Sequence, residues 1–204
     1  LALLVLPGLV AGGASLSKTG TTQETKSSYS TSSSLSSAYD GSNSSTSTIN
    51  ARACYAENTC TAASITVEYS LTVSGSPDLL EFEWHLYSLD SFAPIGSKGE
   101  IDIYDRTNSQ WDSVTSKIGT LGGWTLETFT LSSKYIGNGG QVDIRTHVEH
   151  SGTQTNSDEL QMVIKDFWFY ATDSDSDGIA DVDDNCPSTK NSGQEDYDDD
   201  DEGD

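Results

Sequence analysis

The chain of 204 residues has few basic side chains. It contains 10 lysine and arginine residues against 32 aspartate and glutamate residues, which gives a formal net charge of -22. Residues 173–204 alone carry fourteen acidic residues and one lysine. A surface with this charge repels nucleic acids and anionic lipid headgroups and attracts cations. We therefore expect no nucleic-acid partner and favour a cation.

The sequence also lacks an apolar run long enough to span a membrane, which takes about 20 residues. The opening run LALLVLPGLV is shorter, and Pro7 interrupts it. A run of this kind before small residues is typical of a secretory signal peptide, so residues 1–14 are assigned as a signal-peptide-like segment. The alternative is that this segment is retained and buries its leucines against a partner subunit.

Cysteine is scarce, with three in the chain, and no CxxC pair points to a zinc or redox site. Cys54 and Cys60 lie in the short stretch CYAENTC, which a disulfide between them would close. In a secreted protein the third cysteine, Cys186, is left without a partner by this pairing.

Residues 15–50 are rich in serine and threonine and poor in large apolar side chains. Such a composition is typical of a flexible or glycosylated linker. The alternative is an extended strand that pairs with the edge of a sheet, because serine and threonine are compatible with strands. Asn43 begins an NSS sequence, which fits an N-glycosylation acceptor.

Residues 51–171 show hydrophobic alternation with a period of two. In SITVEYSLTV and LLEFEWHL, apolar and polar side chains alternate, and glycine, serine and asparagine mark the turns. No stretch shows a helical period. We expect an all-β fold, an antiparallel β-sandwich, with a bulge where the apolar phase changes between Leu126 and Phe129.

The order of these strands and turns resembles the jelly-roll sandwich domains of secreted and cell-surface proteins, which include carbohydrate-binding modules. The resemblance covers about residues 65–171 and involves no diagnostic motif. It implies an extracellular domain and leaves glycans open as partners.

The last segment, residues 172–204, contains DSDSDGIADVDD, in which aspartates alternate and Gly178 follows the third of them. Calcium takes about six to eight oxygen ligands, and EF-hand-type loops supply them from alternating side chains, with a glycine at the sharp turn. The spacing therefore predicts a calcium loop with these ligands: Asp173, Asp175, Asp177, the carbonyl of Ile179, Asp181 and Asp184.

No amphipathic helix follows this loop, unlike in an EF-hand; the sequence continues DNCPSTKNSGQ. The whole segment resembles a thrombospondin type 3 repeat, with the pattern DxDxDGxxDxxDNCPxxxNxxQxDxDxDGxGDxC. The resemblance implies an irregular calcium-binding repeat and a second, weaker loop with the ligands Asp196, Asp198, Asp200 and Asp204. Asp201 replaces an expected glycine there. In these repeats the DNCP cysteine pairs with a neighbouring repeat, so we expect the partner of Cys186 in further chain or in another subunit.

No catalytic motif accompanies these features, so we expect a protein that is not an enzyme. His85, His147 and His150 are assigned to the surface, and Glu81 and Glu83 to a solvated sheet face rather than to a glycosidase pair. The aromatic residues Trp111, Trp124, Trp168 and Tyr170 fit a core role or stacking on sugar rings.

Together these observations predict a secreted or cell-surface calcium-binding protein with a structural or adhesive role. One form of that role is a subunit of an extracellular fibre that self-associates through calcium-stabilised contacts. The alternative is a carbohydrate-binding module of a larger secreted hydrolase, which a row of exposed aromatic residues on one sheet face would favour.

Overall fold

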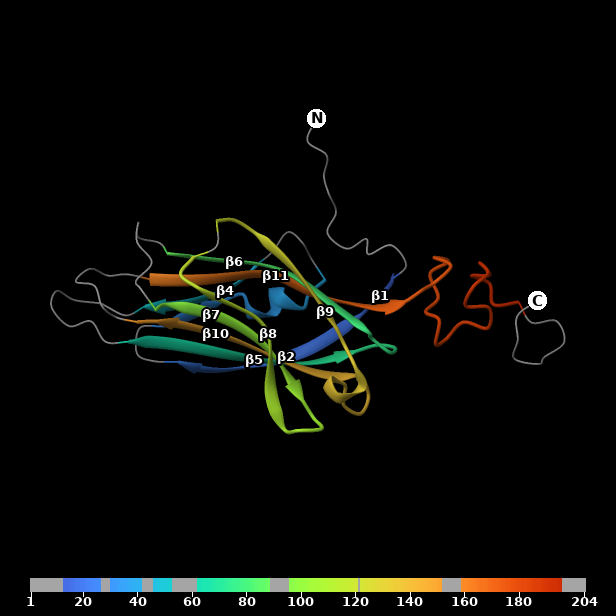
Figure 1. Ribbon diagram of the computed structural model, residues 1–204, viewed down its shortest axis with the longest axis horizontal. Helices are drawn as coiled ribbons and strands as arrows, with labels where there is room; N and C mark the ends of the chain where they lie inside the picture. The colour runs from blue at the N-terminus through green and yellow to red at the C-terminus, as the bar shows by residue number, and fades with distance from the viewer. Residues whose placement is uncertain are drawn as a thin grey trace, which may run out of the picture.

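The computed structural model describes residues 13–26, 30–41, 46–52, 62–88, 96–120, 122–151 and 159–195. These residues form two antiparallel sheets that pack face to face, and the acidic tail extends from one end of the pair (Figure 1). The prediction of an all-β antiparallel sandwich is confirmed. Among the described residues, no helix has both the length and the apolar character that crossing a membrane requires.

The first sheet, sheet A, has the strand order β3-β4-β11-β6-β9, and β1 pairs with β11 beside β4. The strands are β1 (Gly13–Leu16), β3 (Thr31–Ser33), β4 (Ser47–Arg52), β6 (Leu79–Ser88), β9 (Thr125–Thr130) and β11 (Glu159–Thr172).

The second sheet, sheet B, has the order β2-β5-β10-β7-β8. Its strands are β2 (Lys18–Lys26), β5 (Ala63–Val73), β7 (Lys98–Asp105), β8 (Gln110–Ile118) and β10 (Gln141–His150). Two short 3-10 helices, η1 (Leu35–Ala38) and η2 (Ser133–Tyr135), complete the described elements.

The core lies between the two sheets and consists of the side chains that the alternation predicts. In β5 and β6 the inward-facing residues are 0% or 1% exposed: Ile65, Val67, Tyr69, Leu71, Val73, Leu80, Phe82, Trp84 and Leu86. The Phe167 ring packs edge-on against Tyr69 and Phe82, with ring centroids 5.3 and 5.6 Å apart. Aromatic contacts of this geometry add to the free energy gained by burial.

The serine- and threonine-rich segment contributes strands to the sandwich. β2 pairs with β5 from Lys18 to Lys26, and β4 pairs with β11 from Ser47 to Arg52. For residues 15–50 the sequence left two alternatives, a flexible linker and an extended segment that pairs with a sheet. The described strands β2 and β4 fit the second. The sandwich thus includes strands that precede residue 51, and β1 begins inside the segment assigned as signal-peptide-like; residues 1–12 lie outside the described residues.

The bulge expected between Leu126 and Phe129 is wrong. β9 pairs with β6 in continuous register, while register shifts occur in β11 between Ile164 and Phe167 and between Ile101 and Asp102 of β7. The change of apolar phase has another cause: Leu126 faces outward and is 51% exposed, whereas Phe129 packs against the core. Periodicity cannot distinguish an extra residue from an exposed leucine.

Candidate functional site

The predicted calcium loop begins where β11 ends. The backbone N–H of Asp181 donates to the carbonyl of Thr172 at 2.8 Å, and the N–H of Thr172 donates to Asp78 Oδ2 at 3.0 Å. The Thr172 hydroxyl also donates to Asp78. These bonds attach the start of the tail to the end of the sandwich, where Figure 1 shows it beyond β1 and β11.

Three carboxylates converge in this loop. Oxygen atoms of Asp173, Asp175 and Asp177 all lie within 4.8 Å of one another. Asp173 is buried and accepts hydrogen bonds from the backbone N–H groups of Ser176 (2.8 Å) and Gly178 (3.0 Å). Gly178 has a φ of 99°, a conformation that favours glycine, so the turn depends on it.

Two carboxylate oxygens of the tail are buried without a hydrogen-bond partner, Asp175 Oδ2 and Asp184 Oδ2. Desolvation, followed by the charge of Asp177, raises the pKa of Asp175, and the charges of Asp184 and Asp173 act in the same direction. Buried oxygens of this kind normally have a partner. A calcium ion, which prefers carboxylate oxygens, fits this donor set.

The other predicted ligands lie around this cluster. Asp181 accepts from the N–H and the hydroxyl of Ser174 at 2.7 and 2.6 Å, and these bonds lower its pKa. The N–H of Ile179 donates to Asp177 Oδ1 at 2.9 Å. Asp184 Oδ1 accepts from the Cys186 N–H at 2.8 Å. The structure thus brings Asp173, Asp175 and Asp177 together, while the carboxylate of Asp181 binds Ser174.

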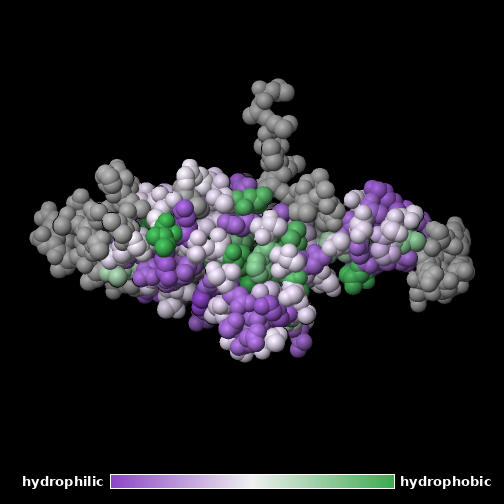
Figure 2. Space-filling model, viewed as in Figure 1, coloured by the Kyte–Doolittle hydropathy of each residue, from purple (hydrophilic) through white to green (hydrophobic). Residues whose placement is uncertain are grey.

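The next part of the repeat packs onto the loop. The N–H of Asn191 donates to Asp177 Oδ2 at 2.8 Å, and the Lys190 Nζ donates to the Ser176 carbonyl at 2.9 Å. Gln194 donates to Asp184 Oδ1 at 2.9 Å. Figure 2 shows the described part of this tail as a mostly hydrophilic lobe beside the sandwich, and the hydrogen bonds above link its loops.

Several predicted sites lie outside the described residues. These are the second-loop ligands Asp196, Asp198, Asp200 and Asp204, the pair Cys54 and Cys60, and the glycosylation acceptor Asn43. Cys186, which is described, is a free cysteine of intermediate exposure.

The outer face of sheet A carries an aromatic row. Trp124 is 45% exposed; its ring centroid lies 5.8 Å from that of His85, which lies 4.9 Å from that of Tyr87. The Lys165 Nζ sits 4.8 Å from the centroid of the Trp124 ring and pairs with Glu83. The sequence indicated Trp124 but missed Tyr87 and Lys165, because only the pairing of β6 with β11 places them together.

Two predictions about polar residues are wrong. His150 is buried at the end of β10 rather than exposed, and desolvation lowers its pKa. Glu81 is 4% exposed and accepts from Thr128, and desolvation raises its pKa. The alternation correctly placed Glu81 on the outer face of sheet A, but other side chains cover this part of the face. The sequence of one strand does not show which parts of its outer face are covered.

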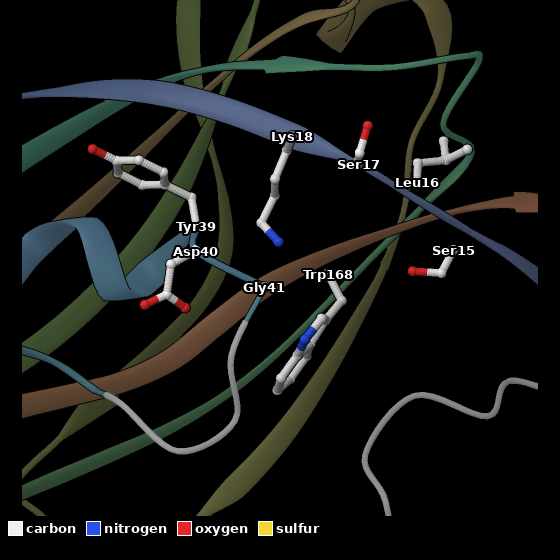
Figure 3. A pocket seen from close by; sticks show the side chains of 8 residues that line it. All are labelled: Ser15, Leu16, Ser17, Lys18, Tyr39, Asp40, Gly41 and Trp168. Atoms are coloured by element: carbon white, nitrogen blue, oxygen red, sulfur yellow. The ribbon is translucent and has the colours of Figure 1, made fainter.

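A pocket of about 360 Å³ opens where the chain crosses from sheet A to sheet B (Figure 3). Trp168 from β11 forms one wall, while Lys18 of β2 and Asp40, beyond η1, supply charged groups. Its lining consists of Ser15, Leu16, Ser17, Lys18, Tyr39, Asp40, Gly41 and Trp168. The pocket combines an aromatic wall with charges of both signs, and neither feature was apparent from the sequence.

No protein-family model and no curated protein matches the chain. Among solved structures, the chain is similar to TmCBM61 in complex with β-1,4-galactotriose, with 13% identity over 72% of this chain and 86% of that one and a TM-score of 0.39. It is also similar to the family 32 carbohydrate-binding module of NanJ from C. perfringens in complex with galactose, with 14% identity over 74% and 93% of the two chains and a TM-score of 0.32.

A third similar structure is the K3 cleaved adhesin domain of Lys-gingipain from Porphyromonas gingivalis W83, with 11% identity over 61% of this chain and 74% of that one and a TM-score of 0.36. TM-scores this low do not establish a shared fold. The functional argument for this chain therefore rests on its own residues.

Proposed function

We propose that this chain is a non-enzymatic, extracellular calcium-binding protein with a structural or adhesive role. The observation that carries the proposal is the cluster of Asp173, Asp175 and Asp177 within 4.8 Å, together with the two buried carboxylate oxygens without a hydrogen-bond partner. A cation that binds there supplies partners for these oxygens and offsets the repulsion among the carboxylates.

Calcium also couples to the order of the tail. The tail holds its loops through carboxylates that accept from backbone N–H groups, as Asp173 does from Gly178 at 3.0 Å. Because the tail buries few apolar side chains, the free energy of calcium binding supplies stability to its folded form. The anchoring of Thr172 to Asp78 transmits that rigidity to the sandwich, which suits a tail that spaces or joins domains.

The test is a calcium titration of the whole chain that follows tail order by circular dichroism and particle size by light scattering. We expect calcium to order the tail and EDTA to reverse the change. Growth of the particles with calcium supports a fibre subunit, whereas ordering without growth limits calcium to a local stiffening role. No change in either signal contradicts the calcium proposal.

A second candidate function is glycan binding by the sandwich, as in a carbohydrate-binding module. The observation that favours it is the aromatic row of Trp124, His85 and Tyr87 on the outer face of sheet A. The exposed ring of Trp124 and the partly exposed rings of His85 and Tyr87 offer flat apolar surfaces, and the neighbouring Lys165 and Glu83 offer hydrogen-bonding groups for hydroxyls. This arrangement suits an extended polysaccharide.

Affinity electrophoresis in gels that contain β-glucan, galactan or xylan tests this candidate. Retardation of the wild-type chain and its loss in Trp124→Ala support binding by the aromatic row. Ile118→Ala is the matched control, because Ile118 is 72% exposed but lies on β8 of sheet B. Equal retardation of both variants and wild type contradicts a role for the row.

A further inference from the structure

The strand order of sheet A leaves a gap along one edge of β11. β4 pairs with β11 from Glu159 to Ile164, and β1 pairs with it from Phe169 to Thr172. Among the described strands, none pairs with residues 165–168 on this side. The register shift of β11 between Ile164 and Phe167 falls within the same stretch. The pocket in Figure 3, which we name the gap pocket, opens beside this stretch.

A buried ion pair lies in the gap. Lys18 reaches from β2 of the other sheet to Asp166, and its Nζ lies 3.0 Å from the Asp166 carboxylate. Their side chains are 5% and 0% exposed. The attraction within a buried ion pair often offsets only part of the hydration free energy that the two charges lose. A contribution to stability is therefore a weak explanation for this pair.

Charges of both signs therefore meet at the gap pocket. Lys18 and Asp40 line it, and Asp166 lies behind Lys18. Burial raises the pKa of Asp166 to about 6 despite the neighbouring Lys18, and the charge of Asp40 contributes in the same direction. Figure 3 shows the side chains of Lys18, Asp40 and Trp168 on three sides of the same space.

The lining selects a class of ligand. The Asp40 carboxylate repels an anion in the pocket, and the Lys18 amine repels a cation. A neutral ligand with several hydroxyls can donate to Asp40 and accept from Lys18 at once. Trp168 is 8% exposed, and the exposed part of its side chain gives the pocket an apolar surface for the C–H groups of such a ligand. The volume of about 360 Å³ lies at the small end of the range for ligand pockets.

We propose that the gap pocket binds a single neutral sugar unit, such as the terminal unit of a glycan. This inference rests on the glycan-binding candidate above and assigns it a second site. The aromatic row on the outer face offers an open platform for a chain, whereas the gap pocket is concave and encloses one unit. A terminal sugar presents the free hydroxyls that Asp40 and Lys18 would bind.

The test measures binding of galactose, glucose and N-acetylgalactosamine to the whole chain by isothermal titration calorimetry. The first variant is Asp40→Asn, because Asp40 is exposed and its replacement leaves the core intact. Asparagine keeps one carbonyl acceptor but loses the charge, and the change from a charged to a neutral hydrogen bond weakens binding by roughly five- to tenfold. Trp168→Phe tests the contribution of the Trp168 side chain to sugar binding. Trp124→Ala is the matched control, because Trp124 belongs to the aromatic row and not to the gap pocket. Circular dichroism confirms that each variant is folded.

We expect at least one of these sugars to bind the wild type and Trp124→Ala alike, and Asp40→Asn more weakly. The indole N–H signal of Trp168 in a nitrogen–proton correlation spectrum should shift with the sugar. Binding that Asp40→Asn and Trp168→Phe leave unchanged overturns the gap pocket as its site. If the chain binds a polysaccharide through Trp124 but no single sugar, the gap pocket fails alone; if it binds neither, the glycan-binding candidate fails with it.

Discussion

Replacement of Asp175 by asparagine is the sharpest test of the calcium loop. Asp175 belongs to the cluster of three carboxylates, and its Oδ2 is buried without a hydrogen-bond partner. Asparagine has nearly the same shape but removes one negative charge. The variant therefore changes the electrostatics of the site with little change in packing.

Two opposing effects set the expected size. In the dielectric constant of water, a unit charge about 2.4 Å from Ca²⁺ favours binding by a factor of roughly 350. When calcium orders the tail, closing the loop also brings this charge to within 4.8 Å of Asp173 and Asp177, and each of these repulsions opposes binding by a factor of roughly four. The net loss of calcium affinity in Asp175→Asn is roughly 20-fold.

Calorimetric titration with calcium measures this loss, and Asp183→Asn is the control for net charge. Asp183 is exposed, and its position in the sequence lies outside the expected ligand set, so its replacement should change the affinity far less. The reasoning is refuted if Asp175→Asn binds calcium as tightly as the wild type. Equal losses in the two variants also refute it, because they would reflect net charge rather than coordination.

Two further predictions concern the sandwich. Phe167→Ala removes a fully buried ring that contacts Tyr69 and Phe82, and should lower the free energy of unfolding in urea by about 3–5 kcal/mol; a loss well below this range would show that the core closes over the cavity. Burial raises the pKa of Asp166 from 3.8 to about 6, so the native state keeps this proton to higher pH than the unfolded chain does. Stability from this group therefore falls as the pH rises through that interval, and Asp166→Asn should remove this part of the pH slope of unfolding; identical slopes would contradict it.

The fold could be predicted where one face of a strand is apolar. β5 and β6 alternate so regularly that the buried residues follow from the sequence, as Tyr69 and Phe82 show. The same rule fails at the strands that carry little apolar surface. β2 is mostly exposed along Lys18–Lys26, and backbone pairing with β5 holds it in place. Because its side chains bury little apolar surface, its sequence shows no apolar alternation and resembles a linker.

The candidate sites divide in the same way. The cluster of the proposed calcium loop follows from local spacing, since Asp173, Asp175 and Asp177 lie within five consecutive residues and Gly178 turns the chain beside them. The ion pair beside the gap pocket joins Lys18 to Asp166 across 148 positions of sequence, and no local pattern signals such a contact.

The sequence by itself thus determined the alternation that makes a β-sandwich and the acidic spacing that gathers three carboxylates in one loop. Both depend on periods of a few residues, which the backbone geometry of a strand or a tight turn converts directly into structure. Only the tertiary structure decided which serine-rich strands join the sheets, which outward side chains are covered and where β4 and β1 leave β11 open. Those outcomes depend on contacts between segments far apart in the chain, whose pairing a local pattern does not encode.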